Sequence, residues 1–398
     1  MSRGRTRRAT LAMALIGLTT GSAHAARLEY VADLGVERND NLNLSQANPL
    51  EDTIYRPGIG FSLTEDAEKF RGSAAGRVEY RHYADGVYDN GFVGDLAARG
   101  DWRVIPERLT FTIEDALAQA AIDTFEADNP DNQQQVNVLA IGSTVDFRMG
   151  SALDGQVELR YVDFNAEVTD EFNSGRVDLV LRTIRRIDET SQAAVNVRGQ
   201  SVDFDDEGIG RNYRRGDLYA SYERHLNHFN LELDIGYSHI GYTHGFDSRS
   251  EPLFRADITW IPDDSKFLSM EITSQFSDAA TDTMERHEDV MIPGSILTSD
   301  TVINASPFNE ERGVLSYTHT ATLISASIDT YAHTLDYVES DEFDQEGYGV
   351  RGALLWIINP RTTVGVFGGF DHIDYLQLER EEEYLRYGVN FGHSFSRH

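Results

Sequence analysis

The 398-residue chain has no cysteine, nine prolines and three tryptophans. Without cysteine it has no disulfide framework and no thiol chemistry. Basic residues are also scarce, because 35 lysines and arginines stand against 66 acids, for a formal charge of −31. So acidic a chain lacks the basic surface that binds nucleic-acid phosphates, and no nucleic-acid partner is expected.

Long hydrophobic runs are missing after residue 25, and the mean hydropathy is −0.41. A membrane-spanning helix needs about 20 apolar residues. Residues 1–25 have a basic start, a short apolar run and the small-x-small site Ala23-His24-Ala25, which are the marks of a cleaved signal peptide. We expect an exported protein whose residues 26–398 form one domain, because no linker or low-complexity tract divides them.

Alternation with a period of two dominates the chain and predicts strands with one apolar face. In residues 385–395 the apolar positions are odd-numbered and the even-numbered positions are mostly polar or glycine. Residues 28–37, 229–238 and 254–260 alternate in the same way. Such a segment near the end of an exported chain is typical of an outer-membrane β-barrel, whose strands are only half apolar.

Short polar turns recur about every 40 residues, several with a proline that cannot donate to a strand ladder. They lie at 65–68, 102–108, 149–154, 186–191, 225–228, 260–264, 320–322 and 356–361. Eight such turns with both chain ends on one side imply about 18 strands. The predicted fold is therefore all-β: a transmembrane antiparallel up-and-down β-barrel of 16–18 strands in the outer membrane of a Gram-negative bacterium.

Longer polar segments alternate with these turns, at 38–52, 116–132, 165–174, 203–211, 241–251, 278–312 and 338–347. Short turns at one end and long loops at the other are the barrel asymmetry. The 278–312 segment is long enough to fold inward and plug the barrel. Helical periodicity is nearly absent, with residues 114–125 the only candidate. A half-buried soluble sheet would also alternate, but a soluble protein of this size should contain continuous apolar core strands.

A barrel of 16–18 strands leaves an aqueous channel. The polar face of the predicted strands carries both signs of charge, either as cross-strand ion pairs that stiffen the wall or as a field and hydrogen-bond ladder for a polar solute. The three tryptophans Trp102, Trp260 and Trp356 all lie near short turns and predict an aromatic belt at one membrane interface. The lumen-lining candidates are Asp33, Arg56, Arg77, Glu79, Arg81, Asp95, Arg99, Asp101, Glu158, Arg160, Glu232, Asp234, Arg255, Asp257, Glu271, Arg351 and Arg386.

Motifs for catalysis or cofactor binding are not found in the sequence. There is no nucleotide loop, no Gly-x-Ser-x-Gly elbow and no His-Glu-x-x-His zinc motif. The histidine pairs His225/His228 and His239/His244 lack zinc-ligand spacing, and the acidic segments 39–41 and 203–207 lack a full calcium-loop pattern. We therefore expect no catalytic residue, cofactor or metal, with Ser316 and His319 as a nominal hydrolase pair.

Three short motifs resemble those of a family of β-barrel proteins encoded with exopolysaccharide synthesis genes. They are Val36-Glu37-Arg38-Asn39-Asp40-Asn41-Leu42, residues 129–138, and the proline turn at 358–363. The resemblance implies an outer-membrane barrel tied to secretion of surface polysaccharide. Its implied partners are polysaccharide and periplasmic or inner-membrane export proteins, beside the outer-membrane lipid and barrel-assembly machinery that any such barrel meets.

The first functional hypothesis is accordingly a hydrated conduit for exopolysaccharide export. The alternative is a general or cation-favouring diffusion porin, which the acidity suggests. A structural barrel with a plugged lumen and an outer-membrane hydrolase remain as further alternatives.

Overall fold

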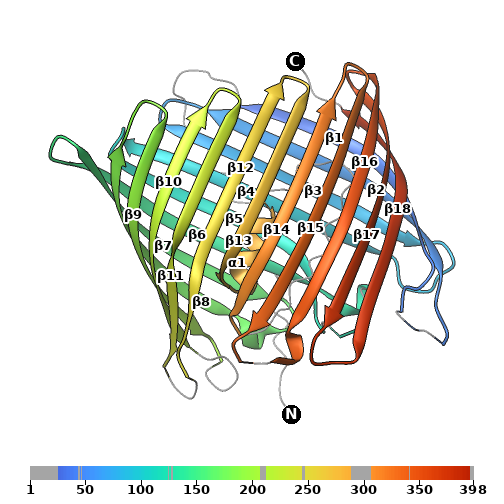
Figure 1. Ribbon diagram of the computed structural model, residues 1–398. Helices are drawn as coiled ribbons and strands as arrows, with labels where there is room; N and C mark the ends of the chain where they lie inside the picture. The colour runs from blue at the N-terminus through green and yellow to red at the C-terminus, as the bar shows by residue number, and fades with distance from the viewer. Residues whose placement is uncertain are drawn as a thin grey trace, which may run out of the picture.

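The computed structural model describes residues 26–394 except 44, 46, 124, 127–128, 207–211, 244–246, 288–305 and 340. Eighteen strands form one antiparallel sheet that closes into a barrel, with each strand paired to its neighbour in sequence (Figure 1). The strands are β1 Arg27–Asn39, β2 Asp52–Asp66, β3 Phe70–Tyr83, β4 Gly91–Ile105, β5 Leu109–Ala121, β6 Gln133–Met149, β7 Leu153–Ala166, β8 Ser174–Arg186, β9 Ser191–Phe204, β10 Tyr213–Leu226, β11 Phe229–Tyr242, β12 Arg249–Asp263, β13 Lys266–Ser277, β14 Phe308–Thr320, β15 Ile324–Tyr337, β16 Gln345–Asn359, β17 Thr362–Tyr375 and β18 Arg380–Ser394.

The barrel closes where the last strand meets the first. β1 pairs antiparallel with β18 from Val31↔Ser394 to Glu37↔Gly388. The predicted antiparallel barrel of about 18 strands is therefore confirmed. The predicted signal peptide and Phe395, the aromatic residue near the chain end, lie outside the described residues.

Alternation decides which face each strand turns outward. In β18, Leu385 is 72% exposed, and Tyr387, Val389 and Phe391 are also exposed, while the intervening positions face the interior. The same holds around the barrel, for example at Ile59 of β2. Large apolar side chains standing exposed on the outside of a closed barrel form a lipid-facing band, about 25 Å tall in proteins of this kind. The fold is thus that of an outer-membrane transmembrane barrel.

Loop lengths are sorted by side. All eight predicted short turns connect the even-numbered strands to the strands that follow, at the end where β1 begins and β18 ends. Longer loops connect most strands at the other end, three of them with short 3₁₀ helices, η1 Pro130–Asn132, η2 Asp170–Phe172 and η3 Asp341–Phe343, whereas β17 and β18 are joined by residues 376–379 alone. Sequence inspection did not single out the connections after β3 and β17.

The three tryptophans share a local structure. Each lies beside a register shift in the hairpin, between Arg103 and Ile105, between Trp260 and Asp263, and between Ile357 and Asn359. A bulge of this kind inserts a residue and ends regular pairing, which accommodates the proline that follows each tryptophan. Trp102, Trp260 and Trp356 are 54%, 48% and 57% exposed, so all three stand on the outer surface at the short-turn end.

The one helix candidate, residues 114–125, does not form a helix. Leu109–Ala121 is strand β5, so the loop expected from residue 116 begins only after residue 121. Alanines at 116, 118 and 120 have high helix propensity, but they face the interior of the barrel and are buried, and Ala118 and Ala120 pack in one cluster with the distant Ala279 and Ala280. Tertiary packing overrides propensity here. No helix among the described residues is long and apolar enough to cross a membrane.

Candidate functional site: the barrel lumen

The lumen wall contains every charged residue that we selected from the sequence. Each of the 17 candidates occupies a strand position that alternates with exposed apolar residues and so lies on the inner face. They are not one site, because the barrel distributes them over β1–β4, β7, β11–β13, β16 and β18. Their role in permeation stays a prediction.

The densest charge cluster lies on β1–β3, where Glu79 is surrounded by arginines. Its carboxylate contacts Arg56 at 2.8 Å, Arg81 at 2.9 Å and Arg77 at 3.1 Å. Arg77 also pairs with Asp33 at 2.6 Å. The Arg56 and Glu79 side chains are each only 6% exposed. Pairing at this density in a buried position fixes the wall geometry, because removing one partner would leave an uncompensated charge.

A second cluster lies on β4–β7. Arg99 contacts Asp101 at 3.2 Å, and both Arg99 and Arg160 pair with Glu114. Glu114 was missed as a lumen residue, because it lies at the start of the segment that was the one helix candidate. Continued alternation from Phe111 and Ile113, which are exposed on the outside, would have placed it inside.

The inner face of strands β10–β13 is acidic near the short β10–β11 and β12–β13 turns. Glu223 lies directly across from Glu232, Glu232 from Asp257, and Asp257 from Glu271. We name these four side chains the acidic row. Asp234 is adjacent, and pairs with Arg255 at 2.8 Å.

Like charges directly opposite one another destabilise a sheet, so the acidic row is not explained by wall stability. Glu223 at one end pairs with Arg182. Sequence inspection found three of the four members but not Glu223, and it did not show that they are in register.

Aromatic rings stack on several lumen arginines. The guanidinium carbons of Arg351, Arg255 and Arg386 lie 5.2, 5.0 and 5.0 Å from the ring centres of Tyr331, Tyr219 and Tyr384. Arg351 also pairs with Asp371 at 3.0 Å. Cation–π contact orients a guanidinium without neutralising it.

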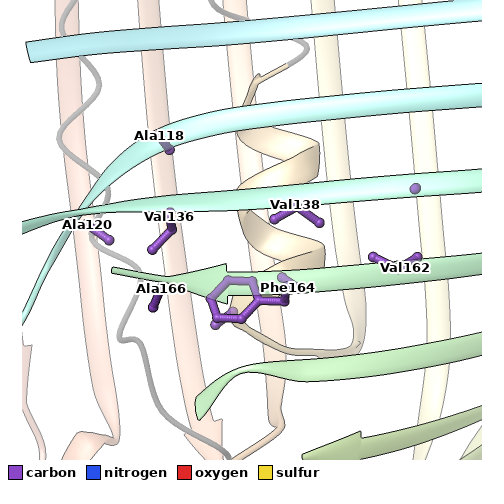
Figure 2. Packing of buried hydrophobic residues seen from close by; sticks show 10 residues of the cluster. Ala118, Ala120, Val136, Val138, Val162, Phe164 and Ala166 are labelled. Atoms are coloured by element: carbon purple, nitrogen blue, oxygen red, sulfur yellow. The ribbon is translucent and has the colours of Figure 1, made fainter. Parts of the chain in front are cut away.

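The β13–β14 connection turns into the lumen and forms helix α1 (Ala279–His287). Figure 2 shows this helix beside β5, β6 and β7, where Val138, Val162 and Phe164 point toward it. Ala279 and Ala280 belong to the same buried apolar cluster. The described part of the 278–312 segment therefore folds inward, as the sequence suggested it could.

Asp278, just before α1, anchors the helix to the wall. Its carboxylate pairs with Arg176 of β8 and accepts a 2.6 Å hydrogen bond from the Tyr213 hydroxyl of β10. The same carboxylate accepts from the Thr281 backbone N–H at 2.9 Å, as an N-terminal cap does. Burial raises the pKa of Asp278, but the Arg176 guanidinium and these hydrogen bonds outweigh burial and hold the pKa well below its usual range.

The residues considered for hydrolysis or metal binding do not form a site in the described part of the structure. Ser316 and His319 are three positions apart on β14 and so lie on opposite faces of the wall. Among the described residues, no group of three or more histidines, cysteines or acids is placed to hold a metal ion. His244 and part of the 203–207 segment lie outside the described residues.

Comparison with known proteins gives distant likenesses to solved structures. No protein family and no curated protein matches the chain. OccK2 (OpdF) of Pseudomonas aeruginosa is 12% identical with a TM-score of 0.47, over 94% of this chain and 100% of that one. A BenF-like porin from Pseudomonas fluorescens Pf-5 is 7% identical with a TM-score of 0.48, over 95% of this chain and 100% of that one. OccAB4 of Acinetobacter baumannii is 7% identical with a TM-score of 0.46, over 94% of this chain and 98% of that one. With TM-scores this low, the fold rests on the chain's own strand pairing.

Proposed function

We propose that the protein is a passive diffusion channel of the outer membrane that favours cations. The acidic row is the observation that carries this proposal. Glu223, Glu232, Asp257 and Glu271 place four carboxylates side by side on a lumen wall, at a cost to sheet stability. Carboxylates lining a water-filled pore raise the local concentration of cations and repel anions. Helix α1 narrows the same lumen from the β5–β7 side.

The test is the reversal potential of purified protein in planar bilayers under a potassium chloride gradient. The variant Glu232→Gln/Asp257→Asn/Glu271→Gln removes three charges from the acidic row. We expect the ratio of cation to anion permeability to fall several-fold. The matched control removes three outward acids at strand ends, Glu65→Gln/Glu346→Gln/Glu381→Gln, and should leave the ratio unchanged. Equal ratios in wild type and the row variant would refute the proposal.

Exopolysaccharide export is the second candidate. It is supported by the resemblance of the three motifs and by the ring–guanidinium stacks at Tyr219, Tyr331 and Tyr384, because sugar rings bind to aromatic faces flanked by hydrogen-bond donors. With no nucleotide motif in the sequence, movement would be driven by diffusion or by upstream synthesis. Its expected partners are periplasmic and inner-membrane export proteins, and the barrel-assembly machinery would insert the chain.

Gene deletion separates the two candidates. Loss of surface polysaccharide with retention of its lipid-linked precursor would support export. Unchanged polysaccharide, together with an open cation-selective pore, would support the diffusion channel alone. Added glycan should block single-channel current only if the lumen binds it.

A further inference from the structure

An acidic side chain faces the lipid at mid-height of the barrel. Asp115 is the seventh of thirteen residues in β5 and lies on the same face of the strand as Ile113, two residues earlier, which is exposed on the outside. Its inward neighbours Glu114 and Ala116 face the lumen side, where Ala116 is buried. In the other described strands, outward-facing Asp, Glu, Lys, Arg and His side chains lie within four residues of a strand end.

Strand register fixes the depth of Asp115. A continuous row of paired residues starts at Leu28 and Leu63, beside the β2–β3 turn, and ends at Gly175 and Asp203, beside the long loops. Asp115 lies at the centre, because four strands precede β5 in the row and four follow it. The full row is Leu28, Leu63, Ala74, Ala98, Asp115, Leu139, Asp163, Gly175 and Asp203.

Among the residues that the structure describes, the Asp115 carboxylate has one polar partner on the same face. The Asn137 side-chain amide of β6 donates to the Asp115 carboxylate at 2.8 Å. The neighbours of Asp115 along the row on β4 and β3 are Ala98 and Ala74, which are too small to cover it. A charged side chain on the lipid face near the bilayer centre costs about 2–4 kcal/mol for the basic residues and less for the acidic ones. Such residues normally face protein or water.

We propose that the outer face of β5 and β6 around Asp115 and Asn137 is an interface with a second copy of this chain. The pair is self-complementary, since it offers both an acceptor and an amide donor. Two barrels related by a two-fold axis along the membrane normal therefore place each Asp115 next to the partner's Asn137. A symmetric contact of this kind uses one patch twice. Small flanking side chains such as Ala98 allow the close approach that polar pairs need in lipid.

The absence of cysteine gives a clean test, because single cysteines can be introduced. Leu139 pairs directly with Asp115 and faces lipid. In native outer membranes, Leu139→Cys should form a disulfide-linked dimer of the chain on oxidation. The matched control Leu354→Cys, outward on β16 and 51% exposed, should not. Mass spectrometry of the product identifies the partner as the same chain.

Adding Asp115→Leu to Leu139→Cys should reduce cross-linking about tenfold or more, as the loss of one strong interaction does, while Glu311→Leu should not. If Asp115→Leu does not assemble, as judged by heat-modifiable gel mobility, Asn137→Leu has the same expected effect. No dimer at position 139, equal dimer at 354, a different partner, or undiminished cross-linking in the Asp115 and Asn137 variants would each overturn the proposal. Any of these outcomes would mean that the barrel is a monomer whose Asp115 carboxylate is hydrated by water.

Discussion

The Asp278 carboxylate pairs with the Arg176 guanidinium inside the barrel and so joins the start of helix α1 to strand β8. The two residues are 7% and 4% exposed. Since they are far apart in sequence, the pair holds a loop segment in the lumen that local structure alone would not place there.

Breaking this pair should release α1. In Asp278→Asn we expect larger and noisier single-channel conductance, because the helix would no longer be fixed against the wall. The unpaired Arg176 should lower the unfolding free energy by about 3–5 kcal/mol, measured by urea titration of folded barrel in lipid. The control Tyr213→Phe removes one hydrogen bond but keeps the ion pair, so it should cost about 1.5–3 kcal/mol and leave the conductance near wild type. Unchanged conductance in Asp278→Asn would show that the pair does not position α1.

The same pair sets a pH dependence. Because the pKa of Asp278 is lowered in the folded state, its contribution to stability is complete above the unfolded pKa of about 3.9. The contribution is lost only as the pH falls from there through the folded pKa. Conductance steps that arise from α1 movement should therefore not appear between pH 5 and 8. If wild type shows conductance steps between pH 5 and 8 and Asp278→Asn does not, the pKa of Asp278 is raised in the folded state and not lowered.

The cluster around Glu79 should be much more important to stability than surface pairs. Glu79→Gln leaves Arg56, Arg77 and Arg81 without their shared partner and should cost about 3–5 kcal/mol. Glu29→Gln is the matched control, because the Glu29 pair with Arg27 is solvated and should contribute about 0–1 kcal/mol. If the two variants lose the same unfolding free energy, the Glu79 cluster stabilises the barrel no more than an exposed ion pair does.

The tryptophan positions predict where lipid quenches fluorescence. Trp102, Trp260 and Trp356 are exposed near the short turns, so they should lie at the level of the headgroups. Lipids brominated near the headgroup should quench their emission more than lipids brominated near the chain end. Stronger quenching by the deep label would place the tryptophans inside the hydrocarbon and shift the whole barrel in the membrane.

Much of the barrel could be predicted from the sequence, because short turns and strand alternation depend on residues that are neighbours in the chain. The strand count followed from eight short turns, three of them with a proline after Trp102, Trp260 or Trp356, and the outward faces followed from clean alternation, as in β11 and β18. The same alternation gave the inner face of Asp33, Glu232 and the other candidates. These features need only neighbouring residues, so one sequence contains them.

The features that were missed depend on long-range contacts. Ala118 and Ala120 fell in the one helix candidate, because nothing near them in the sequence shows that Ala279 and Ala280 will pack against them. The acidic row depends on register across four strands, which is set by turn lengths and bulges. Asp278 lay in a predicted loop, and only the closed barrel brings it to Arg176 and Tyr213.

Lipid contact of the apolar face is the central claim, and it can be tested with spin labels on single cysteines at positions 385–391 of β18. Labels at the odd-numbered positions, from Leu385 to Phe391, should collide with oxygen dissolved in the bilayer. Labels at Arg386, Gly388 and Asn390 should collide with a water-soluble nickel complex in the lumen. Absence of this two-residue period, or nickel access at the odd-numbered positions, would contradict the account.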